Sequence, residues 1–206
     1  MLKSLKIIIP AVAIVATIGL VGFIGNGFAS DQPEKTAFQD YLTAVSQKSP
    51  KQGKSLMPQS VTPVEGLQLS SFSIPIFRTP DANVIKSYKG TSLIEMLQPT
   101  KEKLWFMMKG EQPEGLVVAD DVQPIKMGGK NRSKDLMNMY RAAKKEVKKE
   151  NQIRYFEFVG QGVFVAKTSK GEQIYLSQGA AQILNLPAGK QLASTDVIAK
   201  MKELLK

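Results

Sequence analysis

Four carboxylates cluster in the sequence around a short apolar segment that is bounded by turn-forming residues. They are Glu111, Glu114, Asp120 and Asp121. Two such groups held at a fixed separation can serve as general acid and general base in glycoside hydrolysis. Acids are also common in surface turns, where they keep the turn solvated. Since nothing nearby in the sequence indicates a deep site, solvation is the preferred interpretation, and carboxylate-dependent hydrolysis stays as an alternative.

The sequence lacks the residues that several other common catalytic mechanisms require. The 206-residue chain contains neither histidine nor cysteine. Serine–histidine and cysteine–histidine catalysis are therefore excluded, as are zinc sites built from these two residue types. The serine–lysine spacing S-x-x-K, the glycine-rich phosphate loops and the EF-hand loop are missing as well. We expect no catalytic residue, no metal site and no cofactor, although the enzyme question stays open because of the carboxylates.

The residues from 130 to 154 form a strongly basic stretch, with nine lysines and arginines and three acids, in a chain of net charge +10. Four of its lysines recur at i, i+1, i+4 and i+5, which would align them along one side of a helix. They are Lys144, Lys145, Lys148 and Lys149. Such a row can contact a polyanion, whether an anionic lipid, an envelope polymer or a nucleic acid. The alternative is a solvated helix face, which the interruptions by Glu146 and Glu150 favour.

A second candidate surface is aromatic. Tyr155, Phe156 and Phe158 lie in one predicted strand, and Phe164 and Tyr175 lie in the next two. Aromatic side chains on adjacent strands usually pack together in a core. A shallow apolar groove for a peptide or a lipid is the alternative interpretation.

Periodicity and turn residues predict the elements that carry these side chains. Apolar residues at helical spacing predict helices over 31–45, 79–88, 91–98, 133–151, 178–189 and 194–206. Strand-like segments lie at 67–77, 103–110, 116–120, 122–127, 152–159, 162–168 and 172–177. Because hairpin connections dominate, we expect an α+β fold with an antiparallel sheet and packed helices. The segment 103–110 is apolar on both faces, which predicts a central strand that buries Trp105.

The first 29 residues have the features of a segment that directs export. Lys3 and Lys6 precede an uncharged run from Ile7 to Gly25, which as a helix would span roughly 28 Å. That length approaches the hydrocarbon thickness of a bilayer, and the preceding lysines orient the N-terminus to the cytoplasm. Gly27 and Ala29 also fit a signal-peptide cleavage site. Both a cleaved signal peptide and a retained membrane anchor remain open.

The rest of the chain divides by composition into three parts. Residues 30–46 predict an amphipathic helix, and residues 47–66 contain three prolines and two glycines and read as a linker. Residues 67–206 then form the α+β domain, which we expect to fold without the preceding residues.

These features together favour a non-enzymatic binding or accessory domain that is exported and either tethered to the membrane or secreted. Its expected partner, besides the membrane at the N-terminal segment, is an envelope protein or an anionic polymer or lipid. Nucleic acid is not expected, because export removes access to chromosomal DNA. The alternatives are a membrane-anchored subunit of an envelope complex and, less favoured, a carboxylate-dependent hydrolase.

Overall fold

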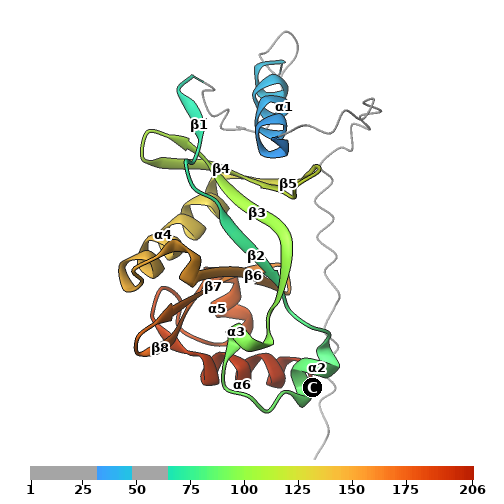
Figure 1. Cartoon of the computed structure of the whole chain (residues 1–206), viewed down its shortest axis with the longest axis vertical. Helices are drawn as coiled ribbons and strands as arrows, with labels where there is room; N and C mark the ends of the chain where they lie inside the picture. The colour runs from blue at the N-terminus through green and yellow to red at the C-terminus, as the bar shows by residue number, and fades with distance from the viewer. Residues whose placement is uncertain (1–31, 48–64) are drawn as a thin grey trace, which may run out of the picture.

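The computed structural model describes residues 32–47 and 65–206, and Figure 1 shows the arrangement of their elements. The fold is α+β, as predicted, with helices packed on a single nine-stranded sheet. The strands are β1 (Leu67–Leu69), β2 (Ile74–Arg78), β3 (Gln98–Lys109), β4 (Gln112–Ala119), β5 (Pro124–Gly128), β6 (Ile153–Phe158), β7 (Gln161–Thr168), β8 (Gly171–Leu176) and β9 (Leu192–Ala193). The helices are α1 (Pro33–Gln47), α2 (Ala82–Ser87), α3 (Leu93–Met96), α4 (Lys130–Glu146), α5 (Gln178–Leu184) and α6 (Ser194–Leu204).

The sheet is mixed, which corrects the expectation of a purely antiparallel one. Its order is β5-β4-β3-β2-β6-β7-β8-β9, and β1 pairs with β3 beside β2. The pairing of β2 with β6 is parallel and all the other pairings are antiparallel. The sheet therefore consists of two meanders, β2–β5 and β6–β9, whose first strands lie side by side. A long helix follows each meander, α4 after the first and α6 after the second.

Helices cover both faces of the sheet. On one face α4 packs over a core that crosses both meanders, with Leu104 and Phe106 from β3 and Tyr155 and Phe164 from β6 and β7. On the other face α2, α3, α5 and α6 enclose a core built on β6, β7 and β8. A smaller cluster on that second face joins Ala37 and Phe38 of α1 to β3 and β4. The predicted amphipathic helix thus packs on the domain.

Irregular pairing curves the first meander. The registers of β2 with β3, β3 with β4 and β4 with β5 each contain a shift, and such bulges bend strands and increase their twist. Figure 1 shows β3 bent along its length. As a result Lys126 Nζ of β5 lies 2.5 Å from Glu157 Oε1 just before the end of β6, although three strands separate β5 from β6 in the sheet order.

Trp105 is half-buried, which differs from the predicted full burial. The strand is covered on both faces, since Leu104 and Phe106 pack under α4 and Met107 under α1. Trp105 lies at the margin of the α1 cluster, against which it packs with part of its side chain.

The predicted N-terminal apolar run lies outside the described residues, as does most of the predicted linker. Within residues 32–47 and 65–206, no helix is both long and apolar enough to cross a bilayer.

Candidate functional site

A groove of about 650 Å³ runs between α4 and the β1–β2 connection, and we call it the α4 groove. One wall consists of three residues from two adjacent turns of α4, which are Tyr140, Arg141 and Lys144. The other consists of Ser70 and Phe72 in the connection, and Met108 of β3 contributes to the floor. The sequence predicts one strand over 67–77, but the structure breaks it into β1 and β2, and this break creates the groove.

Local hydrogen bonds fix the β1–β2 connection. Ser70 Oγ donates to the carbonyl of Phe72 at 2.6 Å and accepts from the Phe106 amide at 3.1 Å. A serine hydroxyl that bonds nearby backbone competes with the strand ladder and favours a turn. The bend places the Phe72 ring against Tyr140, with centroids 4.8 Å apart and planes only 12° from parallel.

Two cations border this aromatic pair. Lys144 Nζ lies 5.7 Å from the ring centroids of both Phe72 and Tyr140, within the range of a cation–π contact. Arg141 donates from Nη2 to the carbonyl of Glu111 at 2.8 Å, which holds the guanidinium at the rim. The groove thus presents an apolar floor with two positive charges at its edge. Such a surface can contact the anionic groups of an extended chain while its apolar parts pack on the rings.

The structure separates the four predicted lysines. Helix α4 ends at Glu146 rather than near residue 151, because Val147 is extended, with φ −119° and ψ 150°. Lys144 and Lys145 therefore lie in its last turn, where cations interact favourably with the helix dipole. Lys148 and Lys149 are exposed beyond the end of the helix. Of the four, Lys144 lines the α4 groove.

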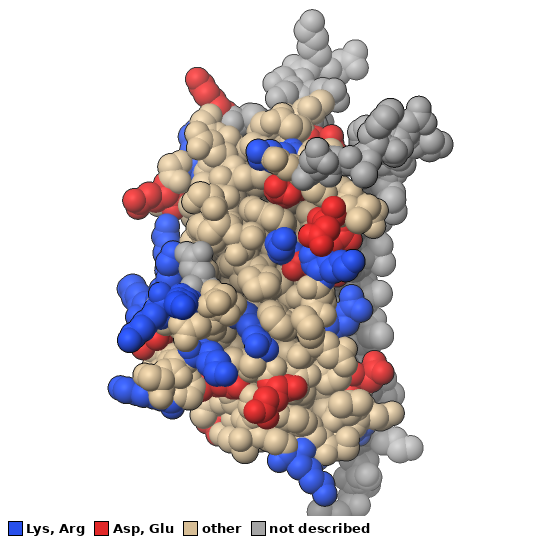
Figure 2. Space-filling model, viewed as in Figure 1, with Lys and Arg blue, Asp and Glu red and all other residues tan. Residues whose placement is uncertain are grey.

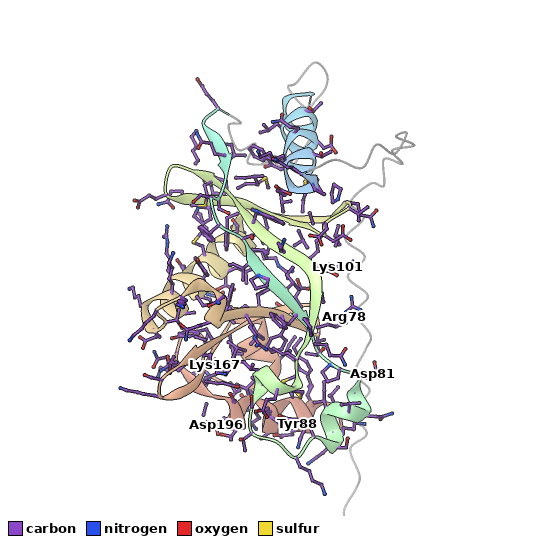
Figure 3. All side chains as sticks on the ribbon, in the orientation of Figure 1. Arg78, Asp81, Tyr88, Lys101, Lys167 and Asp196 are labelled. Atoms are coloured by element: carbon purple, nitrogen blue, oxygen red, sulfur yellow. The ribbon has the colours of Figure 1, made fainter. Side chains whose placement is uncertain are left out.

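The surroundings of the groove are also basic. Figure 2 shows lysines and arginines gathered along the side of the molecule where α4 and the β7–β8 hairpin lie. Exposed members from these elements and the segment after α4 are Lys134, Lys145, Lys148, Lys149, Lys167 and Lys170. Arg78 and Lys101 lie on the side away from α4 (Figure 3). There Arg78 pairs with Glu102 at 3.6 Å, and Asp120 lines the same shallow cavity, so acids balance those cations.

The aromatic residues for which a groove was the alternative interpretation are part of the core. Tyr155 and Phe156 are fully buried, and Phe158 is 5% exposed. Strand alternation divides them, because Tyr155 packs under α4 while Phe156 and Phe158 pack under the helices of the opposite face. The interpretation of these strand aromatics as core holds, and the opening that Tyr155 lines is a small cavity of about 40 Å³ beside Lys126 and Arg132.

The Tyr155 hydroxyl nevertheless takes part in a polar network. It donates to Glu157 Oε1 at 3.1 Å and accepts from Arg132 Nη2 at 3.3 Å. Arg132 Nη2 and Lys126 Nζ also contact Glu157 Oε1, at 2.9 Å and 2.5 Å. Burial raises the pKa of the Tyr155 hydroxyl well above its ordinary value, and the negative charge of Glu157 adds to this effect. The network links β5, α4 and β6.

The four carboxylates lie at opposite ends of β4 and have separate contacts. Glu111 and Glu114 lie at its beginning and Asp120 and Asp121 just after its end. Six steps along extended chain separate Glu114 from Asp120, about 20 Å, whereas the two carboxylates of a glycosidase lie roughly 5–9.5 Å apart.

Three of these acids have close polar contacts that suit a structural role. The carboxylate of Glu114 is buried and lies 2.7 Å from Lys130 Nζ. Asp120 accepts from the amides of Val122 and Gln123 in its own turn, and Asp121 lies 3.6 Å from Lys103.

Glu172 is a further acid with several polar contacts, half-buried, that the sequence did not indicate. It lines a cavity of about 430 Å³ and accepts from the hydroxyls of Ser92 and Ser194 and from the amides of Leu93 and Ile94. The two carboxylate oxygens of Glu172 thereby connect β8 to the beginnings of α3 and α6. These hydrogen bonds give Glu172 a structural role. Among the described residues, no group of three or more acids is placed to hold a metal ion.

The groove residues Phe72, Tyr140 and Arg141 were not singled out from the sequence. Tyr140 falls at the apolar helical spacing of the segment 133–151, which indicates only a core position, and the contact between Phe72 and Tyr140 joins segments 68 positions apart. A signal existed in the serine pair Ser70–Ser71, which interrupts the strand pattern.

Comparison of the chain with family models, curated proteins and solved structures finds no match.

Proposed function

We propose that the chain is a non-enzymatic binding or accessory domain on the outer side of the membrane, tethered or released by its N-terminal segment. In this proposal the α4 groove holds a stretch of an anionic envelope polymer. The lysine-flanked apolar run supports export, and the basic side of the domain supports an anionic partner.

The observation that carries the proposal is the placement of Arg141 and Lys144 beside the stacked rings of Phe72 and Tyr140. A helix face that is merely solvated would not be expected to border an open groove with an aromatic ring in each wall. An anionic chain in this groove would meet both cations, while its carbon backbone would pack on Phe72. The groove is open along its length, which suits a polymer better than an enclosed small molecule.

Hydrolysis of such a polymer is not part of the proposal. Glu111 is the acid that lines the groove, and the backbone carbonyl of this residue already accepts from Arg141. The other three acids have the structural contacts described above. Binding is therefore the activity that the groove supports best.

The test compares two double variants of the full chain that lose the same charge. Arg141→Gln with Lys144→Gln removes both groove cations, whereas Lys134→Gln with Lys145→Gln removes two exposed cations of the same helix outside the groove. Glutamine keeps the helix propensity of lysine and arginine. Retention on immobilised polyphosphate and polyglutamate is measured at rising salt.

We expect the groove variant to lose roughly tenfold or more in affinity, because a hydrogen bond to a charged group contributes roughly 1.5–3 kcal/mol. The control variant should lose much less, and binding by the parent should fall steeply with salt as screening increases. Equal loss in both variants would show a diffuse charge effect without a groove. Absence of retention at low salt would contradict the proposed function.

A further inference from the structure

The exposed large apolar residues of the domain are unevenly distributed. Six stand out in the described part of the chain, and three of them fall within six positions at the β4–β5 turn and on β5. These are Val122, Ile125 and Met127, which are 65%, 43% and 45% exposed, and we call them the β5 patch. The other three lie singly on separate elements. Scattered apolar residues are normal on a surface, whereas a local group indicates contact with something apolar.

The β5 patch lies beside α1. Met127 pairs with Val117 across the β4–β5 ladder, so both side chains are on the same face of the sheet. Val117 is fully buried there in the cluster with Ala37 and Phe38 of α1. The helix covers Val117 and leaves Met127 in contact with solvent.

The length of the chain before α1 restricts how far this end of the domain can lie from the membrane. The uncharged run ends at Gly25 and α1 begins at Pro33. Eight Cα-to-Cα steps span at most about 29 Å when fully extended. If residues 7–25 lie in a bilayer, the beginning of α1 stays within that distance of the hydrocarbon edge, which keeps the elements packed on α1 within reach of the membrane.

One alternative explanation of the β5 patch is that a strand from a second copy of the chain pairs with β5. The residues of β5 do not favour this explanation. β5 is the outermost strand of its meander, but Pro124 has no amide hydrogen and Lys126 carries a charge. Proline and lysine on an edge strand are the usual means of preventing edge-to-edge pairing. The side chains of the patch, rather than the backbone of β5, are therefore the feature to explain.

We propose that the α1–β5 end of the domain rests on the lipid bilayer, with Val122, Ile125 and Met127 entering the boundary between headgroups and acyl chains. Amphipathic surfaces of this kind bury their apolar side chains roughly 5–10 Å into that boundary. Lys103 and Asp121, which pair beside the turn, would stay among the headgroups. This inference rests on the tethering part of the proposed function and is independent of the α4 groove.

The test uses the full chain reconstituted in vesicles. Because the chain contains no cysteine, one introduced cysteine can be labelled uniquely with an environment-sensitive dye. Met127→Cys reports on the patch, and Val122→Cys provides a second position within it. Val84→Cys is the matched control, since Val84 is also apolar and 50% exposed but lies on α2, at the opposite end of the molecule from α1 (Figure 1). The quencher is lipid brominated near the headgroup end of its acyl chains.

We expect labels at 127 and 122 to lose at least about half of their emission in brominated vesicles, and the label at 84 to change little, because only the first two would reach the boundary. Equal emission at all three positions in a protein that still floats with vesicles would overturn the bilayer contact while leaving the tether intact. It would direct attention to a partner protein on the patch. Failure of the chain to float with vesicles would overturn both the tether and the contact.

Discussion

The two meanders of the sheet differ in how completely helices cover them. β6, β7 and β8 lie between α4 on one face and α2, α3, α5 and α6 on the other, and Phe156 and Phe164 are fully buried. β3 and β4 share the cover of α4 with the second meander, but in the described part of the chain their second face has α1 alone. There Trp105 is half-buried and Met127 is exposed.

This difference indicates a division of tasks between the meanders. The second meander is closed on both faces and has the dense core expected of the part that stabilises a domain. The first meander carries both surfaces that we propose for binding, since the β1–β2 connection and β3 line the α4 groove and β5 carries the patch. Open apolar surface is costly in water, so its presence on one meander points to partners there.

The comparison of the two meanders predicts the largest loss of stability when an aromatic ring is removed from the second meander, which is covered on both faces. Phe156 is fully buried under α3, α5 and α6, where Phe156→Ala would leave a cavity that rigid neighbours cannot fill. We expect a loss of about 3–5 kcal/mol in the free energy of unfolding. Chemical denaturation measures it, with Val84→Ala on the exposed face of α2 as the control within about 0.5 kcal/mol. A loss below about 1 kcal/mol would show that the second meander is not the stabilising half.

The same kind of substitution in α1, the helix that covers the first meander, should reduce the free energy of unfolding by less than Phe156→Ala does. Phe38 of α1 is 8% exposed and packs on the outer face of β3 and β4. Because α1 can detach locally without unfolding the sheet, Phe38→Ala should cost about 1.5–3 kcal/mol, the burial free energy of one ring. Hydrogen exchange should also speed up at α1 before it does so at β7.

The exposed Gln39 on the same helix gives the control, Gln39→Ala, for which little change is expected. If Phe38→Ala has no effect on stability or exchange, then α1 does not cover the domain in solution. Residues 67–206 would in that case fold as independently as the sequence predicts.

Local patterns made much of this fold predictable. The stripe of α4 and the hairpins β6–β7 and β7–β8 follow from spacing and from glycines at tight turns, and Gly160 and Gly171 indeed adopt positive φ. The parallel pairing of β2 with β6 left no local trace, since 74 residues separate the two strands. The bulges that curve the first meander were also invisible, because residues 104–107 and 116–119 are apolar throughout and so hide a shift in alternation.

The candidate site was only half predictable for the same reason. Lysine spacing drew attention to Lys144, but the end of α4 at Glu146 separated the predicted row. The lysines continue the helical periodicity past that point, so spacing alone could not locate the end. Phe72 entered the site through a tertiary contact with Tyr140, and no rule of spacing connects those two residues.

The smallest expected loss of stability comes from a change in the polar network that links the two meanders. The Tyr155 hydroxyl of β6 bonds Glu157 and Arg132, and Glu157 reaches Lys126 of β5. Tyr155→Phe removes the hydroxyl and keeps the ring, so the cost at neutral pH should be about 1 kcal/mol. The pH dependence separates this role from simple packing, because burial followed by the charge of Glu157 raises the pKa of this hydroxyl in the folded chain.

A raised pKa means that the folded state favours the protonated tyrosine. That contribution to stability is complete below the unfolded value of about 10 and is lost as pH rises through and beyond it. The parent should therefore lose stability above about pH 10 more steeply than the Phe variant, and the difference between the two proteins should shrink. Burial also raises the pKa values of Tyr41, Tyr88 and Tyr175, but those residues contribute equally to both proteins. Denaturation curves from pH 7 to 11 measure the difference. A constant difference across that range would show that the hydroxyl titrates normally and that the link between the meanders lies elsewhere.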